Sequence, residues 1–215
     1  MNPRKDAVVH AGPRAHRQDV VVAGKHARLR EPHIAPVTEL VDRIRAHVGH
    51  DHVPYVDPTS GGVYARVLFL LETPARPAAL GSGMLSPDND DATAANVWEL
   101  YREFDLGRTT AIHWNAVPWF LGDADRNKNA QRSDIAPGLP WLAELIDLMP
   151  DLRLVIAMGE IARKAFGLYL LREDARLLPW LPVAHPSPRV RNTNPALWQD
   201  IRAAFAKAVA VSHAS

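Results

Sequence analysis

The sequence AHPSPRVRN, residues 184–192, decides how the rest of the chain is interpreted. It follows a short apolar run, residues 180–184, that is typical of a buried strand. Asn194 and Pro195 then predict the start of a helix, because Asn is a favoured N-cap and proline suits the first helical position. His185 therefore stands where a strand ends, on a turn stiffened by prolines. In open α/β sheets, ligands bind in the crevice at the carboxyl ends of the strands.

Three more apolar runs, at residues 66–71, 109–117 and 153–158, predict three further strands. Apolar residues at helical spacing predict helices at about 36–48, 91–104, 141–149 and 159–171, and a last helix after residue 194. Strands that alternate with helices indicate parallel pairing through right-handed crossovers. We therefore expect an α/β fold, a three-layer α/β/α sandwich around a central four-stranded parallel sheet.

Composition narrows the class of protein. The 215 residues, of which 47% are hydrophobic, suit one globular domain. Lys and Arg number 25 against 24 Asp and Glu, a balance that neither demands nor excludes a polyanionic partner. The absence of cysteine excludes disulfides, thiolate metal sites and iron–sulfur clusters. No apolar run is long enough for a membrane span, and the N-terminus lacks the apolar core of a signal peptide, so a cytoplasmic location is expected.

The chain divides into an extension and a domain. Residues 1–32 are rich in Arg, Lys, His and Pro and predict a loosely attached, flexible basic extension, either a solvated tail or an arm that touches nucleic acid. Residues 33–215 form the predicted domain. Within it, His50 and His52 raise a metal site as an alternative, but their i, i+2 spacing in a loop without further fixed ligands is a weak pattern.

Polar side chains follow each predicted strand. Because the carboxyl ends of parallel strands share one edge, this edge collects Glu72 with Thr73, His113 with Asn115, Gly159 with Glu160, and His185 with Ser187. An acid, an amide and an imidazole around one crevice make a candidate polar site. Each has a structural alternative: Glu72 as a helix cap or an Arg partner, Asn115 as a bridge to a loop, and His185 as a core histidine.

The four segments together resemble the uracil-DNA glycosylase superfamily. The resemblance rests on Leu-Glu-Thr-Pro at 71–74, Trp-Asn-Ala-Val at 114–117, Gly-Glu-Ile-Ala at 159–162 and His-Pro-Ser-Pro at 185–188. It covers about residues 66–211, and the last motif is the most specific of the four. Members of this superfamily share a four-stranded parallel sheet between helices, which agrees with the fold expected above.

The resemblance implies roles for individual residues. Asn115 matches the amide that reads the edge of uracil, and His185 matches the imidazole that donates to uracil O2. Glu72 and Thr73 occupy the position of the group that handles water or contacts the base. Ser187 would contact a flanking phosphate, and residues 188–192 would enter the groove left by the extruded nucleotide. The candidates for phosphate contacts are Arg126, Lys128, Arg132, Arg189 and Arg191.

The chain also departs from the superfamily's patterns. Thr73 and Ala75 replace an Asp and a Tyr of the best-known branch, so the water activator and the gate against thymine are not identified. The branch that has a Glu in this motif binds a cluster through four cysteines, and this chain has none. The usual stacking Phe is missing from residues 77–91, where Asp88, Asp90 or Asp91 is an alternative source of the carboxylate. We expect a divergent member without a cluster or other cofactor.

The expected function is a monomeric DNA glycosylase that flips uracil out of DNA and hydrolyses its N-glycosidic bond, starting base excision repair. His185 and Glu72 are the predicted catalytic residues, and Asn115, Thr73 and Ser187 the predicted substrate contacts. Two alternatives stay open. One is a module of the same fold that binds uracil or abasic DNA without turnover or through a covalent bond to His185. The other is a hydrolase of free nucleosides.

Overall fold

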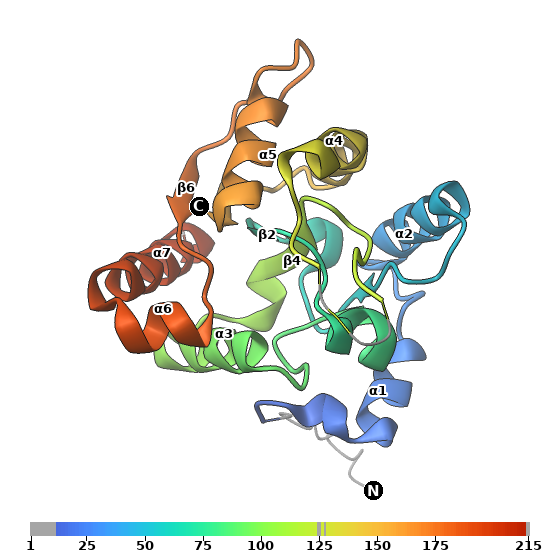
Figure 1. Cartoon of the computed structure of the whole chain (residues 1–215), viewed down its shortest axis with the longest axis horizontal. Coiled ribbons are helices and arrows are strands. Elements are labelled where there is room, and N and C mark those ends of the chain that lie inside the picture. Colours follow the sequence, from blue (N-terminus) through green and yellow to red (C-terminus); the bar gives the residue numbers. More distant parts are fainter. Residues whose placement is uncertain (1–11, 124–125, 127, 214–215) are drawn as a thin grey trace, which may run out of the picture.

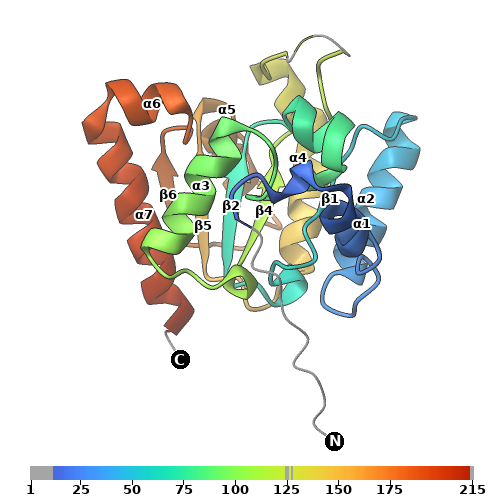
Figure 2. The same cartoon turned by 90° about the horizontal axis from the view of Figure 1, so that it is seen from below.

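Four parallel strands form the centre of the computed structural model, which describes residues 12–123, 126 and 128–213. Their order in the sheet is β4 (Ala111–Asn115), β2 (Val67–Leu71), β5 (Leu154–Met158) and β6 (Trp180–Val183). Each strand pairs in parallel with its neighbour, so all four carboxyl ends lie at one edge. Figure 2 shows α3 lying across the strands and α6, which follows β6, beyond this edge.

Helices cover both faces of the sheet (Figure 1). One layer contains α2 (Ala35–Val48), α4 (Arg132–Asp147) and α5 (Glu160–Leu170), and the other contains α3 (Ala92–Glu103) and α7 (Pro195–His213). The predicted three-layer α/β/α sandwich with a four-stranded parallel sheet is therefore confirmed.

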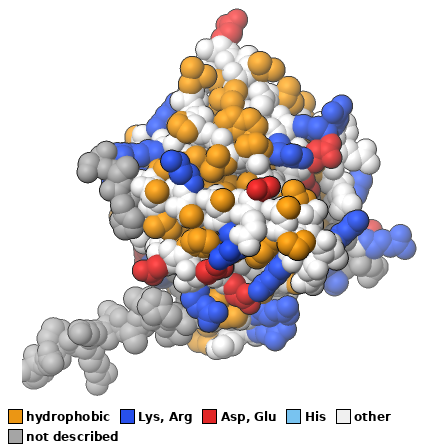
Figure 3. Space-filling model, turned by 90° about the vertical axis from the view of Figure 1, so that its left-hand side faces the viewer, with side chains coloured by type: hydrophobic (Ala, Val, Ile, Leu, Met, Phe, Trp, Pro, Cys, Tyr) orange, Lys and Arg blue, Asp and Glu red, His pale blue; other side chains and the backbone are white. Residues whose placement is uncertain are grey.

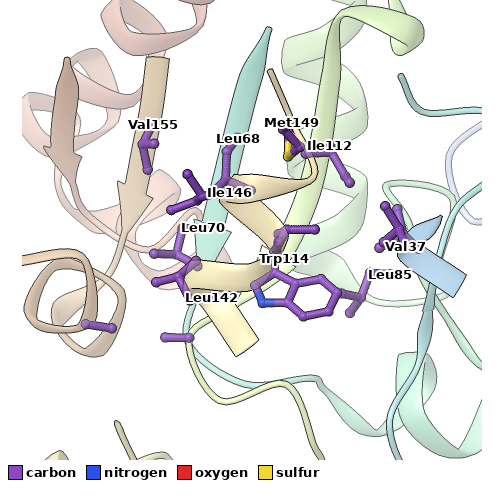
Figure 4. Close-up of a cluster of buried hydrophobic side chains, with 14 of the residues drawn as sticks. Val37, Leu68, Leu70, Leu85, Ile112, Trp114, Leu142, Ile146, Met149 and Val155 are labelled. Carbon is purple, nitrogen blue, oxygen red and sulfur yellow. The ribbon is translucent and has the colours of Figure 1, made fainter. Parts of the chain in front are cut away.

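The strands are apolar throughout because each of their faces is buried under helices. In β2, Leu68 and Leu70 point into the core beneath α2, α4 and α5, whereas Val67 and Phe69 point into the core beneath α3 and α7. Figure 4 shows Leu70 near Leu142 and Leu68 near Ile146, both of α4, in the first of these cores. A strand with one exposed face would instead alternate apolar and polar residues.

Two helices differ from the sequence prediction. The expected helix at 141–149 begins at Arg132, because Gln131 and Asp134 form a capping box and the helix accommodates Pro137 and Pro140. The predicted turn at 188–192 is instead α6 (Pro188–Thr193), for which Ser187 is the N-cap and Pro188 the first residue. The helix expected after residue 194 is present as α7.

Short elements occupy segments between the main strands and helices. β1 (Tyr55–Val56) pairs in parallel with β3 (Met84–Leu85) in a separate two-stranded sheet. Short helices also occur at η2 (Gly62–Tyr64), η3 (Pro77–Ser82) and η4 (Arg108–Thr110). The long segment between β2 and α3 thus contains η3 and β3.

The N-terminal segment packs onto the domain. Its described part, residues 12–32, contains η1 (Ala15–Arg17) and α1 (Asp19–His26), and Lys25 is only 6% exposed. Lys25 Nζ lies 2.5 Å from Asp57 Oδ2 and 2.6 Å from Asp88 Oδ2. The expectation of a loosely attached extension is thus wrong for these residues, while residues 1–11 lie outside the described part. No helix in the described ranges is long and apolar enough to cross a membrane.

Candidate functional site

A pocket with a free volume of about 120 Å³ lies at the carboxyl ends of the strands. The sheet contributes residues from the ends of β2, β4 and β6, among them Thr73, Asn115 and His185. The opposite wall comes from the segment that leads into α3 and from the first turns of that helix: Leu85, Ser86, Pro87, Asn89, Asp91, Thr93, Ala94 and Val97. Three of the four predicted strand ends therefore meet around one cavity.

Asn115 ends β4 and is 3% exposed. Its Nδ2 atom is buried and has no hydrogen-bond partner among the described residues. A buried donor left unsatisfied costs about 1–3 kcal/mol, so most buried polar groups in proteins are paired. Because the side chain lines the pocket, its free donor is available to a bound ligand.

His185 reaches the pocket although β6 is the strand farthest from β4. Asn96 of α3 holds the turn in place, because its Nδ2 donates to the carbonyl of Pro186 at 3.0 Å. Arg191 of α6 in turn donates to Asn96 Oδ1 at 2.6 Å and pairs with Glu99 at 2.7 Å. These contacts fix α6 and the preceding turn against α3.

Burial lowers the pKa of His185, and the charges of Glu72 and Asp91 oppose that shift only in part. The imidazole is therefore neutral at neutral pH. A neutral imidazole carries one N–H donor, which suits a hydrogen bond to a developing anion.

His113 lies beside Asn115 on β4 and also lines the pocket. Its Nε2 lies 3.0 Å from the hydroxyl of Tyr101, and its ring stacks on Phe69 at 5.1 Å between centroids. Burial lowers the pKa of His113 to about 3. His113 is therefore neutral, and its contacts with Tyr101 and Phe69 hold its ring in place at the wall of the pocket.

The depressed pKa of His113 predicts a pH dependence of stability. An unfolded chain binds a proton at His113 below about pH 6.5, whereas the folded chain does not until about pH 3. We expect this residue to reduce the free energy of unfolding by about 1.4 kcal/mol for each pH unit below 6. Urea unfolding of the wild type and of a His113→Gln variant between pH 6 and 4 measures the difference in slope. Equal slopes in the two proteins would contradict the prediction.

Glu72 is placed differently from the expectation for a catalytic acid. It does not line the pocket, and its Oε1 accepts a hydrogen bond from the backbone N–H of Ile161 at 3.1 Å. It thus caps the first turn of α5, where the helix dipole favours a negative charge. This is the structural alternative that its sequence position had left open.

Gly159 leaves the space that Glu72 occupies. Its φ is +101°, and a Cβ atom at this position would lie 2.5 Å from Glu72 Oε1. We predict that Gly159→Ala lowers the free energy of unfolding by about 1–3 kcal/mol, because it combines backbone strain with displacement of the cap. Thermal or urea unfolding tests this, with Gly167→Ala as the control, since a Cβ there meets nothing within 4 Å. Equal losses in the two variants would contradict the proposed cause.

Thr73 and Ser187 both make local hydrogen bonds. Thr73 lines the pocket and its hydroxyl donates to the carbonyl of Trp119 at 3.0 Å. Ser187 lies outside the pocket and its Oγ accepts from the backbone N–H of Val190 at 3.3 Å, as the N-cap of α6.

The predicted phosphate contacts have unequal surroundings. Arg126, Lys128, Arg132, Arg189 and Arg191 are all exposed, but the guanidinium of Arg191 is also engaged with Asn96 and Glu99. Figure 3 shows the face that carries α6 and α7, where Lys and Arg side chains are spread among hydrophobic and acidic ones. Any binding of a polyanion on this face therefore depends on single cations and not on one dense basic patch.

The two groups of possible metal ligands in the described chain have different surroundings. His50 and His52 are exposed, and His50 Nδ1 accepts a hydrogen bond from the backbone of His52 at 3.2 Å. His16, Asp57 and Asp88 lie close enough to hold an ion. However, the ammonium group of Lys25 already binds both of these carboxylates.

The model of the uracil DNA glycosylase superfamily matches residues 45–207. The chain belongs to this superfamily. No curated protein matches it. Among solved structures, the crystal structure of wild-type SMUG2 from Pedobacter heparinus is similar, with a TM-score of 0.52 and 12% identity, over 84% of this chain and 85% of that one. At this identity the likeness concerns the fold. Superfamily membership supports a glycosylase-type activity.

The sequence interpretation missed most of the second pocket wall. Ser86 and Asn89 stand in an irregular segment that has no periodic pattern, and only Asp91 had been named from this wall, as one of three alternative sources of a carboxylate. The available signals were the length of this segment and the position of Asp91 directly before a helical stripe, which is typical of an N-cap. These signals place Asp91 at a helix start but do not say what its side chain faces.

Proposed function

We propose that this protein is a DNA glycosylase that removes uracil from DNA by hydrolysing the N-glycosidic bond, the first step of base excision repair. The observation that carries the proposal is the buried, unpartnered Nδ2 of Asn115 in a pocket shared with His185. An amide offers a donor and an acceptor, which match O4 and N3–H of uracil. Cytosine presents an N–H₂ group and a bare N3 at the same places, so the amide would distinguish the two bases.

Access to such a pocket requires the nucleotide to leave the duplex. A base inside the stack exposes neither its pairing edge nor its glycosidic bond, and extrusion costs a few kcal/mol. The exposed cations Arg126, Lys128 and Arg189 are proposed to hold the flanking phosphates. Ser187 is proposed to support the same backbone, with its hydroxyl hydrogen free to donate while Oγ caps α6.

His185 is proposed to stabilise the departing base. Cleavage leaves negative charge on uracil, chiefly on O2, and positive charge on the sugar. A neutral imidazole N–H fixed by the Pro186 turn would donate to that oxygen without reorganisation. One preorganised donor of this kind contributes about 3–4 kcal/mol to the transition state. Phosphates of the bound DNA would favour the cationic sugar.

The test uses an end-labelled oligonucleotide that contains one uracil, in single- and double-stranded form, with cytosine at the same position as the control. We expect alkali-dependent strand scission with uracil alone, and a rate about 10²–10³-fold lower for His185→Ala. Heating in detergent before electrophoresis separates turnover from a covalent adduct, which would migrate as protein-bound DNA. Absence of scission in both forms, or hydrolysis of free deoxyuridine alone, would refute the proposal.

A further inference from the structure

We propose that Asp91, and not Glu72, is the catalytic carboxylate that positions and deprotonates the attacking water. The inference rests on the proposed glycosylase function and assigns the one role that Asn115 and His185 leave unfilled. Asp91 immediately precedes α3 and is the single carboxylate among the described residues that line the pocket.

The other acidic residues of this segment face elsewhere. Asp88 is 3% exposed, its carboxylate is bound by Lys25 and Arg108, and it does not line the pocket. Asp90 points to the surface, where it pairs with Arg14 and Arg17. The three neighbouring carboxylates therefore have three different environments, and only that of Asp91 includes the cavity.

The carboxylate of Glu72 is already occupied as a helix cap. Its Oε1 accepts from the backbone of Ile161, and the absence of a side chain at Gly159 leaves room for this arrangement. To act on a substrate in the pocket, Glu72 would have to release the α5 terminus. Asp91 is already at the cavity wall.

The position of Asp91 is fixed by the helix that it precedes. Its Oδ1 accepts from the backbone N–H of Ala94 at 2.8 Å, as the N-cap of α3. This hydrogen bond and the positive end of the helix dipole favour the ionised carboxylate. Burial raises the pKa of Asp91 above its ordinary value, which makes it a stronger base than an exposed carboxylate.

Asp91 and His185 approach the same pocket from different elements. One comes from the start of α3 and the other from the turn after β6, and the charge of Asp91 partly opposes the lowering of the His185 pKa by burial. The hydrogen bond from Asn96 of α3 to Pro186 joins these two elements directly. The arrangement places a base and a donor around one bound nucleotide, as the hydrolysis of a glycosidic bond requires.

The reaction is balanced with these groups alone. The bond between C1′ and N1 breaks, and its electron pair leaves with the base, where His185 stabilises the charge. The oxygen of water forms a bond to C1′ while Asp91 accepts one of its protons. That proton then passes to solvent and the base anion gains one, so the products are the abasic sugar with a 1′-hydroxyl and neutral uracil.

The test compares variants that keep the helix cap. Asp91→Asn and Asp91→Ser retain an N-cap oxygen but have no carboxylate, and Glu72→Gln is the matched control. We expect Asp91→Asn to lower the single-turnover excision rate by about 10²–10⁴-fold while its affinity for uracil-containing DNA stays within about threefold of the wild type. Glu72→Gln should stay within about fivefold in rate, and thermal unfolding confirms that each variant folds.

The outcomes separate this inference from the function on which it rests. If the wild type excises uracil and both Asp91 variants keep rates within about threefold, the inference is refuted and the function stands. A large loss in Glu72→Gln with little loss in Asp91→Asn would assign the role to Glu72. A wild-type protein without any excision refutes the proposed function, and the inference falls with it.

Discussion

Replacing Asn115 by alanine should lower the single-turnover rate of uracil excision by about 10²–10³-fold, while the folded protein becomes no less stable. The rate falls because the base loses a preorganised partner at its edge, an effect comparable to removal of one transition-state donor. Stability does not fall because the Nδ2 of Asn115 makes no hydrogen bond in the folded protein. Removal of an unsatisfied buried donor relieves a cost of about 1–3 kcal/mol and offsets the packing that is lost.

This pairing of effects distinguishes a recognition residue from a structural one. Replacing an amide with a structural role would lower both stability and activity, whereas replacing an amide that recognises the substrate lowers activity alone. Urea unfolding gives the free energy, and single-turnover kinetics with the uracil oligonucleotide gives the rate. Gln18→Ala, which removes an exposed amide outside the pocket, is the control. A marked loss of stability in Asn115→Ala with little change in rate would contradict the prediction.

The sheet and two of the residues that line the pocket were predictable from local sequence. Continuous apolar runs identify β2 and β5 because both of their faces are buried, and parallel pairing then brings the strand ends to one edge. Asn115 could be identified as a candidate because an amide buried in an apolar strand needs hydrogen-bond partners. His185 was conspicuous because two prolines fix its turn.

The surroundings of individual side chains were not predictable in the same way. Glu72 follows β2 as expected, yet whether it faces the pocket or α5 depends on Gly159, which is 87 positions away in the sequence. Arg191 resembles a phosphate contact in the sequence, but Asn96 and Glu99 of another helix bind it. Such pairings depend on the tertiary arrangement of elements and leave no periodic pattern.

The N-terminal segment shows even more clearly that local sequence does not predict the surroundings of a side chain. A basic composition is typical of solvated tails, and the pattern contains no sign that one lysine is buried. Lys25 becomes a core residue because Asp57 and Asp88, from distant parts of the chain, are buried opposite it. Neither carboxylate has a short-range sequence signature that identifies it as a partner of α1.

Replacing Lys25 by methionine should lower the free energy of unfolding by about 3–5 kcal/mol, because it leaves two buried carboxylates without their shared counter-charge. Arg108 still pairs with Asp88, so most of the lost free energy comes from Asp57, which is 2% exposed. The matched control is Lys207→Met on the exposed surface of α7, for which we expect a change within about 0.5 kcal/mol. A loss below about 1 kcal/mol in Lys25→Met would contradict this assignment.

The pH dependence of this loss identifies its electrostatic origin. In the wild type, burial alone would raise the pKa of Asp57, but the charge of Lys25 and its hydrogen bonds hold it well below the ordinary value. The stabilisation is therefore complete above about pH 4 and is lost only under stronger acid. Without Lys25, burial dominates and the pKa of Asp57 rises above its unfolded value. The variant must then lose stability as the pH rises from 4 to 7, so the difference from the wild type widens over this range.

The double variant Lys25→Met/Asp57→Asn should recover part of the lost stability and remove most of that widening, because a neutral amide needs no counter-charge. A stability difference that stays constant between pH 4 and 7 would indicate lost packing and not an unpaired charge.

The ion pairs of Lys25 with Asp57 and Asp88 are also connected to the pocket. Asp88 directly precedes Asn89, which lines the cavity and whose Oδ1 lies 2.7 Å from His16 Nδ1. Loss of Lys25 should therefore loosen the pocket wall as well as the N-terminal segment, and the single variant should bind uracil-containing DNA more weakly than the double variant.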